Sequence, residues 1–154
     1  GVTEAGALRQ GTVKNSAAVG ILLESGIGDT MRLSLTADPV EEVHVAWELL
    51  AALGMRRIKP ELVSCPTCGR CGVDMIPIAE EVTKRLDGVR APISVAVMGC
   101  VVNGPGEARG VDLGVACGKG QAVLFENGNP IRKVPEDKIV DELFAEIENR
   151  FGKK

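Results

Sequence analysis

Hydrophobic and polar positions in the first third of the chain alternate between helical and extended patterns. The opening residues GVTEAG (1–6) are typical of the end of a strand, and an apolar run at 17–23 predicts a helix that stops at Gly26. Polar and apolar side chains alternate from Thr30 to Thr36, which predicts a strand. Asp38-Pro39 predicts the start of a second helix, because aspartate caps free N–H groups and proline suits the first turn. Two strand–helix units in succession indicate a βαβα layout with parallel strands.

The second helix carries an apolar stripe, which we expect in the core, and it ends at Gly54. The stripe consists of Val40, Val43, Trp47, Leu50 and Leu53. The next segment, GMRRIKP (54–60), is basic and ends in proline. We interpret it as a linker or domain boundary, which divides the chain into residues 1–56 and 57–154.

The remainder of the chain predicts a compact α+β domain with the element order β-α-β-β-β-α. The expected strands lie at 61–64, 93–98, 111–116 and 122–125, and the expected helices lie at 75–86 and from 135 onward. Asn127-Gly128 supplies a tight turn after the last of these strands, and Gly118-Lys119-Gly120 predicts a hairpin turn. The fold class is therefore α/β in the first part and α+β in the second.

Composition narrows the classes of function. Apolar residues make up 45% of the 154 positions, which is typical of a globular protein. The net charge of −3 and the scarcity of aromatic residues (Phe 3, Trp 1, Tyr 0) argue against a nucleic-acid-binding surface. No apolar run approaches the ~20 residues that a membrane-spanning helix needs. We therefore expect neither nucleic acid nor membrane as a partner.

The chemistry of the chain is concentrated in its cysteines. Three of the five lie within residues 65–71, a clustering that favours metal ligands in a reducing compartment over a secreted disulfide framework. We expect the cytoplasm or an organelle of bacterial descent. The pair Cys65-Pro-Thr-Cys68 is compatible with zinc, a redox disulfide or an iron–sulfur cluster. A zinc ribbon needs a second such pair, which the sequence lacks, so an iron–sulfur cluster is favoured.

Two cysteines compete for the place of third ligand. Cys71 completes C-x-x-C-x-x-C, the spacing by which bacterial ferredoxins bind three irons of one cluster. Cys100 follows an apolar strand in MGCVVNGPGEA (98–108), where glycines and a proline bracket Glu107. Spacing alone leaves both possibilities open. It also leaves Glu107 open to a plainer role as a helix cap after Gly106.

Four segments together resemble one known family. SCPTCGR (64–70), MGCVVNGPGEA (98–108), GVTEAG (1–6) and DTMRLSLTADPVEE (29–42) are similar to the hydroxymethylbutenyl diphosphate synthases, the iron–sulfur reductases of the methylerythritol phosphate route to isoprenoids. The resemblance covers essentially the whole chain. It implies that residues 1–56 are the last two strand–helix units of a TIM-type barrel and that residues 57–154 are the iron–sulfur domain.

The resemblance also implies a set of metal ligands. Cys65, Cys68 and Cys100 match the three thiolate ligands of a [4Fe-4S] cluster, and Glu107 matches its unusual carboxylate ligand, whereas Cys71 falls outside the set. A carboxylate oxygen is a harder and more exchangeable donor than a thiolate. One iron held by Glu107 is therefore open to exchange, which distinguishes a catalyst from an electron carrier.

Four further residues match positions that act on the substrate in the family. Glu4 matches an acid that handles protons, Arg32 and Ser34 match residues that bind the substrate's phosphates, and Asn103 matches a polar residue that faces the substrate. Barrel sites lie at the carboxyl ends of the strands, which agrees with these placements. From the residues alone, Arg32 and Ser34 also fit the polar face of a half-buried strand, and Glu4 fits a solvated loop.

By this resemblance the parent enzyme reductively opens 2-C-methyl-D-erythritol 2,4-cyclodiphosphate to 4-hydroxy-3-methylbut-2-enyl diphosphate. Flavodoxin or ferredoxin would deliver the two electrons singly to a homodimer. We expect the isolated chain to be inactive, since two barrel units cannot close a barrel. Two alternatives stay open: a ferredoxin-like electron carrier that uses Cys71, and a zinc-binding interaction module.

Overall fold

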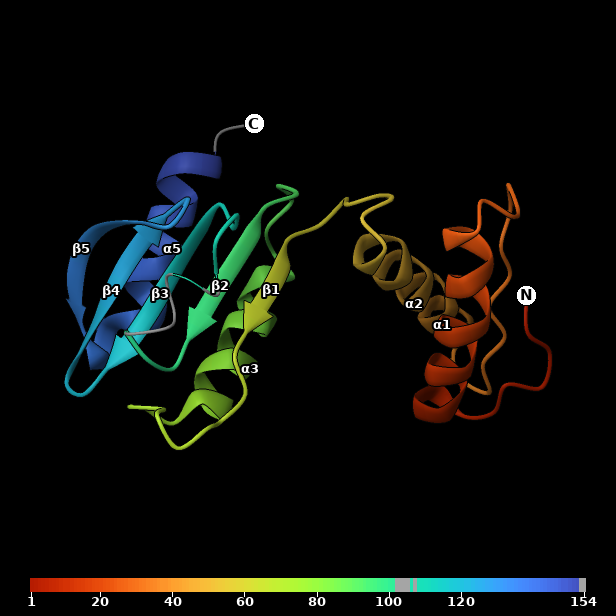
Figure 1. Ribbon diagram of the computed structural model, residues 1–154, viewed down its shortest axis with the longest axis horizontal. Coiled ribbons are helices and arrows are strands. Elements are labelled where there is room, and N and C mark those ends of the chain that lie inside the picture. Colours follow the sequence, from red (N-terminus) through yellow and green to blue (C-terminus); the bar gives the residue numbers. More distant parts are fainter. Residues whose placement is uncertain (102–105, 107, 153–154) are drawn as a thin grey trace. The chain divides into compact units, whose positions relative to one another are not determined.

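The protein divides into two compact units, residues 1–58 and 59–154, in a computed structural model that describes residues 1–101, 106 and 108–152 (Figure 1). No helix within these described residues is both long and apolar enough to cross a bilayer. Each unit has its own packed interior and is described by itself.

The first unit consists of helices α1 (Leu8–Glu24) and α2 (Pro39–Ala52), which lie side by side (Figure 1). The predicted start of α2 is confirmed, because Asp38 Oδ1 accepts a hydrogen bond of 2.9 Å from the N–H of Val40. The predicted helix at 17–23 is correct but too short. Helix α1 begins about two turns earlier, since polar residues fill its first half.

The predicted burial of α2 is wrong at Val40 and Val43, whereas the other stripe residues Trp47, Leu50 and Leu53 are half-buried. Val45 and Leu49 face the interior, whereas Val40 and Val43 are 56% and 55% exposed. The reason is the packing against α1, where a Cβ placed on Gly20 would lie 3.6 Å from Leu49 Cδ1. A glycine in α1 lets α2 approach through its Val45–Leu49 face.

The predicted strand at residues 30–36 is also wrong. Only Thr36 pairs, through one parallel bridge to Ala7, and residues 1–6 form no strand either. The polar–apolar alternation is nevertheless real, since Leu33 is 5% exposed and Arg32 is exposed. An extended segment becomes a strand only when another strand lies alongside to complete the ladder, and no such partner exists among the residues that the structure describes.

The second unit is built on one five-stranded sheet in the order β1-β2-β3-β4-β5 (Figure 1). The strands are β1 (Glu61–Ser64), β2 (Ser94–Met98), β3 (Leu113–Gly118), β4 (Gln121–Glu126) and β5 (Asn129–Pro135). The first three are parallel to one another, and β4 and β5 join as antiparallel hairpins. The four predicted strands are therefore confirmed in place, with small differences at their ends.

Strand β5 is missing from the predicted order β-α-β-β-β-α. The turn before it is confirmed: Asn127 and Gly128 both have positive φ, at 49° and 79°, as a two-residue hairpin turn with the twist of the strands requires. The sequence pattern did not predict the strand that follows, because its prolines at 130 and 135 are unusual within a strand. Proline is tolerated here because β5 lies at the edge of the sheet, where one side needs no hydrogen-bond donors.

Helices α3 (Met75–Leu86) and α5 (Ile139–Phe151) cover one face of the sheet (Figure 1), and the 3₁₀ turn Glu136–Lys138 leads into α5. Alternate residues of the central strands, such as Val95 and Val97, point into this interior. The opposite face carries small residues, and Phe125 packs there beside Ala96 and Ala116. The sheet is therefore buried on both sides at its centre.

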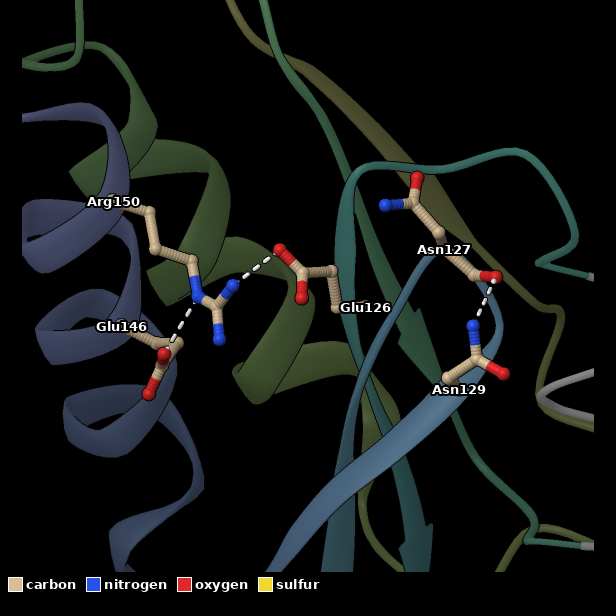
Figure 2. A network of polar contacts seen from close by, with 5 residues as sticks. All are labelled: Glu126, Asn127, Asn129, Glu146 and Arg150. Carbon is tan, nitrogen blue, oxygen red and sulfur yellow. Dashed lines mark hydrogen bonds and ion pairs between the residues drawn. The ribbon is translucent and has the colours of Figure 1, made fainter.

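Arg150 joins the end of α5 to the end of β4 (Figure 2). Its Nε lies 2.6 Å from Glu146 Oε1, one turn earlier on the helix, and its Nη1 contacts Glu126. The hydrogen bonds that the guanidinium donates to Glu146 and Glu126, together with the negative charges of both carboxylates, raise its pKa. Beside Glu126, Asn129 Nδ2 donates to the carbonyl of Asn127 at 3.4 Å and closes the hairpin turn (Figure 2).

Candidate metal centre

Two predicted ligands lie at the carboxyl ends of neighbouring strands. Cys65 follows β1 and Cys100 follows β2 by one residue, and the two strands are parallel with Ser64 opposite Val97. The N–H of Gly99 donates a hydrogen bond of 3.1 Å to Cys65 Sγ. Parallel pairing thus brings Cys65 to the segment that carries Cys100, at the edge of the sheet where open α/β folds bind their ligands.

The loop from Cys65 to Asp74 turns back over the end of β2. The N–H of Cys68 bonds to the carbonyl of Pro66 at 2.9 Å, and the N–H of Cys71 bonds to the carbonyl of Cys68 at 3.0 Å. The N–H of Gly72 then reaches the carbonyl of Gly99 at 2.8 Å. Cys68 is exposed on this loop, whereas Cys65 and Cys100 are half-buried. Cys68 therefore carries the most accessible of these three thiols.

Cys71 points toward the body of the domain. Its Sγ donates to the carbonyl of Val73 at 3.1 Å, and the side chain packs against the main hydrophobic core. Cys117 lies deeper, fully buried on β3. Burial, followed by the neighbouring thiols of Cys71 and Cys65, raises the pKa of Cys117 to about 12. Cys117 is therefore a neutral thiol at physiological pH and a poor nucleophile.

The described residues do not form a complete metal site: no group of three or more His, Cys, Asp or Glu side chains among them is close enough to hold an ion. The predicted ligand Glu107 and the predicted substrate residue Asn103 lie outside the described part of the chain. The predicted ligands that the structure describes, Cys65, Cys68 and Cys100, have free thiols, which is the chemical type of ligand that an iron–sulfur cluster needs. Thiolates are its normal ligands, and a backbone N–H directed at Cys65 Sγ is the type of hydrogen bond that stabilises a ligand sulfur.

The first unit brings together the other predicted residues within its own bounds. Arg32 Nη2 donates to the carbonyl of Gly1 at 3.1 Å, and the N–H of Thr36 donates to the carbonyl of Gly6 at 3.0 Å. The segment with Arg32 and Ser34 therefore runs beside the segment with Glu4. Glu4 is exposed and has a φ of 55°, an uncommon conformation for a residue with a side chain.

The structure adds a residue that the sequence reasoning missed. Asn15 is fully buried in α1, where its Nδ2 donates to the carbonyls of Gly11 at 2.9 Å and Ser34 at 3.1 Å. Its Oδ1 has no hydrogen-bond partner within the described chain. The available signal was an asparagine in the middle of a helix, a residue type that normally favours helix ends.

The fold and these side chains define a two-unit α/β protein that carries cysteines at the carboxyl ends of parallel strands. Comparison with models of protein families identifies the family within this class. The model of the GcpE protein C-terminal domain matches residues 61–149, and that of the GcpE TIM-barrel domain matches residues 1–47. The chain belongs to the GcpE family, and the resemblance inferred from its motifs is confirmed.

Curated relatives agree along the whole chain. A protein of Geobacter sulfurreducens is 56% identical over 154 residues, which is 100% of this chain and 44% of the relative. A protein of Aquifex aeolicus is 56% identical over 149 residues (97% and 42%), and one of Corynebacterium glutamicum is 58% identical over 146 residues (95% and 39%). Each is named 4-hydroxy-3-methylbut-2-en-1-yl diphosphate synthase (flavodoxin). The chain thus spans less than half the length of these relatives.

Proposed function

We propose that this chain is the C-terminal part of a flavodoxin-dependent oxidoreductase of isoprenoid synthesis. The reaction is the reductive ring-opening of 2-C-methyl-D-erythritol 2,4-cyclodiphosphate to 4-hydroxy-3-methylbut-2-enyl diphosphate. The observation that carries this proposal is the 56% identity over the full chain to a synthase of that name. In this proposal residues 1–56 are the last two strand–helix units of a TIM-type barrel, and residues 57–154 are the cluster domain.

The proposed cluster ligands are Cys65, Cys68, Cys100 and Glu107, which would hold a [4Fe-4S] centre. When bound, this centre supplies electrons one at a time and offers one iron whose oxygen ligand can exchange. The hydrogen bond from Gly99 N–H to Cys65 Sγ supports the assignment of Cys65, because it places partial positive charge at the ligand sulfur. The exposed thiol of Cys68 is accessible to an assembling cluster.

The proposed substrate contacts are Arg32, Ser34, Asn103 and Glu4. Arg32 and Ser34 would bind phosphate oxygens, since a guanidinium forms paired, charge-assisted hydrogen bonds to phosphate. Asn103 would donate to or accept from a substrate hydroxyl. Glu4 would hold or release the proton that the ring-opening requires. Its exposure and its strained φ of 55° support this role, because such conformations cluster at functional sites.

The partners follow from the same assignment. Flavodoxin is the electron donor that the relatives' name prints, and ferredoxin is the alternative with the same one-electron chemistry. We place the parent enzyme as a homodimer in the bacterial cytoplasm or in a plastid-type organelle. We expect the isolated chain to bind the cluster but to form no product, because its diphosphate site needs the rest of the barrel.

The test is anaerobic reconstitution of the chain with iron and sulfide, followed by iron and sulfide analysis and electron paramagnetic resonance. We expect four irons per chain and a spectrum that changes in Glu107→Ala, where one iron loses its carboxylate. Glu80→Ala, which removes an exposed glutamate of α3, is the matched control and should leave the spectrum unchanged.

The alternatives predict other outcomes. A ferredoxin-like carrier would lose its cluster in Cys71→Ser and keep it in Glu107→Ala. A zinc module would give a colourless, air-stable protein that contains zinc after anaerobic preparation. Either result would contradict the proposed catalytic cluster.

A further inference from the structure

Gly99 occupies a buried position at the end of β2 where no side chain fits. A Cβ built on Gly99 would lie 2.5 Å from Cys71 Sγ, 3.1 Å from Met75 Cγ and 3.4 Å from Cys71 Cβ. The first of these distances is far below van der Waals contact. The thiol of Cys71 therefore fills the space that a side chain at position 99 would take. We call this space, beside the backbone of Gly99, the Gly99 notch.

The backbone of Gly99 is engaged on both sides of this notch. Its N–H donates to Cys65 Sγ at 3.1 Å, and its carbonyl accepts from the N–H of Gly72 at 2.8 Å. Gly99 is thus hydrogen-bonded to Cys65 at the start of the loop and to Gly72 near its end, and it directly precedes Cys100 in the chain. Displacing Gly99 would disturb all three together.

Cys71 is fixed in the notch by its own hydrogen bonds. Its N–H donates to the carbonyl of Cys68 at 3.0 Å, and its Sγ donates to the carbonyl of Val73 at 3.1 Å. The side chain also packs against the hydrophobic core, to which Met75 and Cys117 belong. A thiol that donates to a backbone carbonyl and packs against a hydrophobic core acts as a small apolar side chain.

We propose that Cys71 is a positioning residue that locks the 65–74 loop onto the end of β2. By filling the Gly99 notch, it sets the distance between the loop thiol of Cys68 and the strand-end thiol of Cys100. The inference rests on the proposed function for the assignment of Cys68 and Cys100 as ligands. It gives the third cysteine of C-x-x-C-x-x-C a role other than the ligation that its spacing suggests.

The test is an exchange of volume between the two positions. Gly99→Ala forces a methyl group into the thiol, and we expect the midpoint of thermal unfolding of the reduced, metal-free chain to fall by about 5–15 °C. In the double variant Gly99→Ala/Cys71→Ala the sulfur is gone and the nearest remaining atom of residue 71 lies at ordinary contact distance. We expect this double variant to recover at least half of the fall in midpoint temperature that Gly99→Ala causes. Gly69→Ala, in the same loop with nothing within 4 Å of the added Cβ, is the matched control and should change little.

Cluster spectroscopy separates positioning from ligation. We expect Cys71→Ala to keep its iron but to give a broadened resonance spectrum, because the loop is less fixed. Cys71→Ser, which can still donate to the Val73 carbonyl, should restore the native line shape. Loss of one or more irons in Cys71→Ser would make Cys71 a ligand and overturn the inference.

The two proposals fail in distinguishable ways. If the native chain takes up no cluster but the unfolding midpoints follow the expected order, the proposed function is contradicted and the lock between Cys71 and Gly99 stands. If the cluster forms but Cys71→Ala does not relieve Gly99→Ala, the lock is contradicted and the proposed function stands.

Discussion

The backbone N–H of Gly99 donates a hydrogen bond of 3.1 Å to the sulfur of Cys65, across the carboxyl ends of β2 and β1. The two residues are 34 positions apart in sequence, and only the parallel pairing of their strands brings them together. This contact places the first cysteine of the C-x-x-C pair next to the segment that carries Cys100. It is the structural basis for treating both segments as parts of one site.

The central strand β3 needs a glycine at position 114, which lies between Ala96 on β2 and Phe125 on β4. A Cβ there would lie 2.4 Å from Phe125 Cζ and 2.8 Å from Ala96 Cβ. We expect Gly114→Ala to lower the free energy of unfolding by about 1–3 kcal/mol, because the aromatic ring must leave its position. Urea denaturation measures this change. Gly88→Ala, whose added Cβ meets its nearest atom at 3.5 Å, should shift the midpoint far less.

Ser94 and Asp112 fasten the starts of β2 and β3 to each other. Asp112 Oδ2 accepts hydrogen bonds from Ser94 N at 2.7 Å and from Ser94 Oγ at 2.8 Å, and Ser94 Oγ accepts from Asp112 N at 3.0 Å. We expect Asp112→Ala to cost about 1–3 kcal/mol, because a buried N–H and hydroxyl lose their acceptor. Denaturant unfolding tests this, with the exposed Asp87→Ala as a control. Equal stability of the two variants would contradict the assignment.

Asn15 holds the segment that carries Arg32 and Ser34. Without its hydrogen bond to the Ser34 carbonyl, the extended segment keeps the bridge at Thr36, a bond of 2.9 Å from Leu35 N–H to Glu42 Oε1 and the bond from Arg32 Nη2 to the Gly1 carbonyl. We expect Asn15→Leu to destabilise the first unit by about 1–3 kcal/mol. Amide hydrogen exchange should become faster at residues 34–36.

Lys14→Ala, on the adjacent exposed position of α1, is the control for this experiment and should leave exchange unchanged. Unchanged protection in Asn15→Leu would mean that packing of Leu33 alone fixes the segment.

The buried thiol of Cys117 makes the free energy of unfolding of the second unit depend on pH, and the direction of this dependence follows from its pKa. Burial raises its pKa from 9.0 to about 12, so the folded chain keeps a proton that the unfolded chain loses between these values. Below pH 9 both states are protonated and the thiol contributes no slope. Above it, the free energy of unfolding should fall by at most about 1.4 kcal/mol per pH unit.

Urea denaturation of the metal-free chain between pH 8 and 10.5 measures this slope. We expect Cys117→Ala to flatten it, whereas Cys68→Ala, which removes an exposed thiol, should leave it as in the native chain. A slope that is the same in all three proteins would show that Cys117 does not ionise on unfolding.

Much of the candidate site could be read from residue types and spacing. The cysteine pair, the segment around Cys100 and their likeness to one family follow from the order of residues, and the family models confirm that likeness. The roles of Asn15 and Gly99 could not be predicted. Each depends on atoms that come together from different parts of the chain, and a glycine after a strand or an asparagine within a helix does not show which atoms it will contact.

By itself the sequence determined the features that depend on near neighbours. Asp38 caps α2 and Asn127-Gly128 turns the hairpin, because each acts on backbone groups within a few residues. Tertiary structure alone decided that residues 30–36 lack a ladder, that Val40 is exposed, that β5 lies at the edge and that Cys71 fills the Gly99 notch. Strand pairing and side-chain packing are made by residues distant in sequence, so the hydrophobic pattern of one segment cannot specify which partner will lie against it.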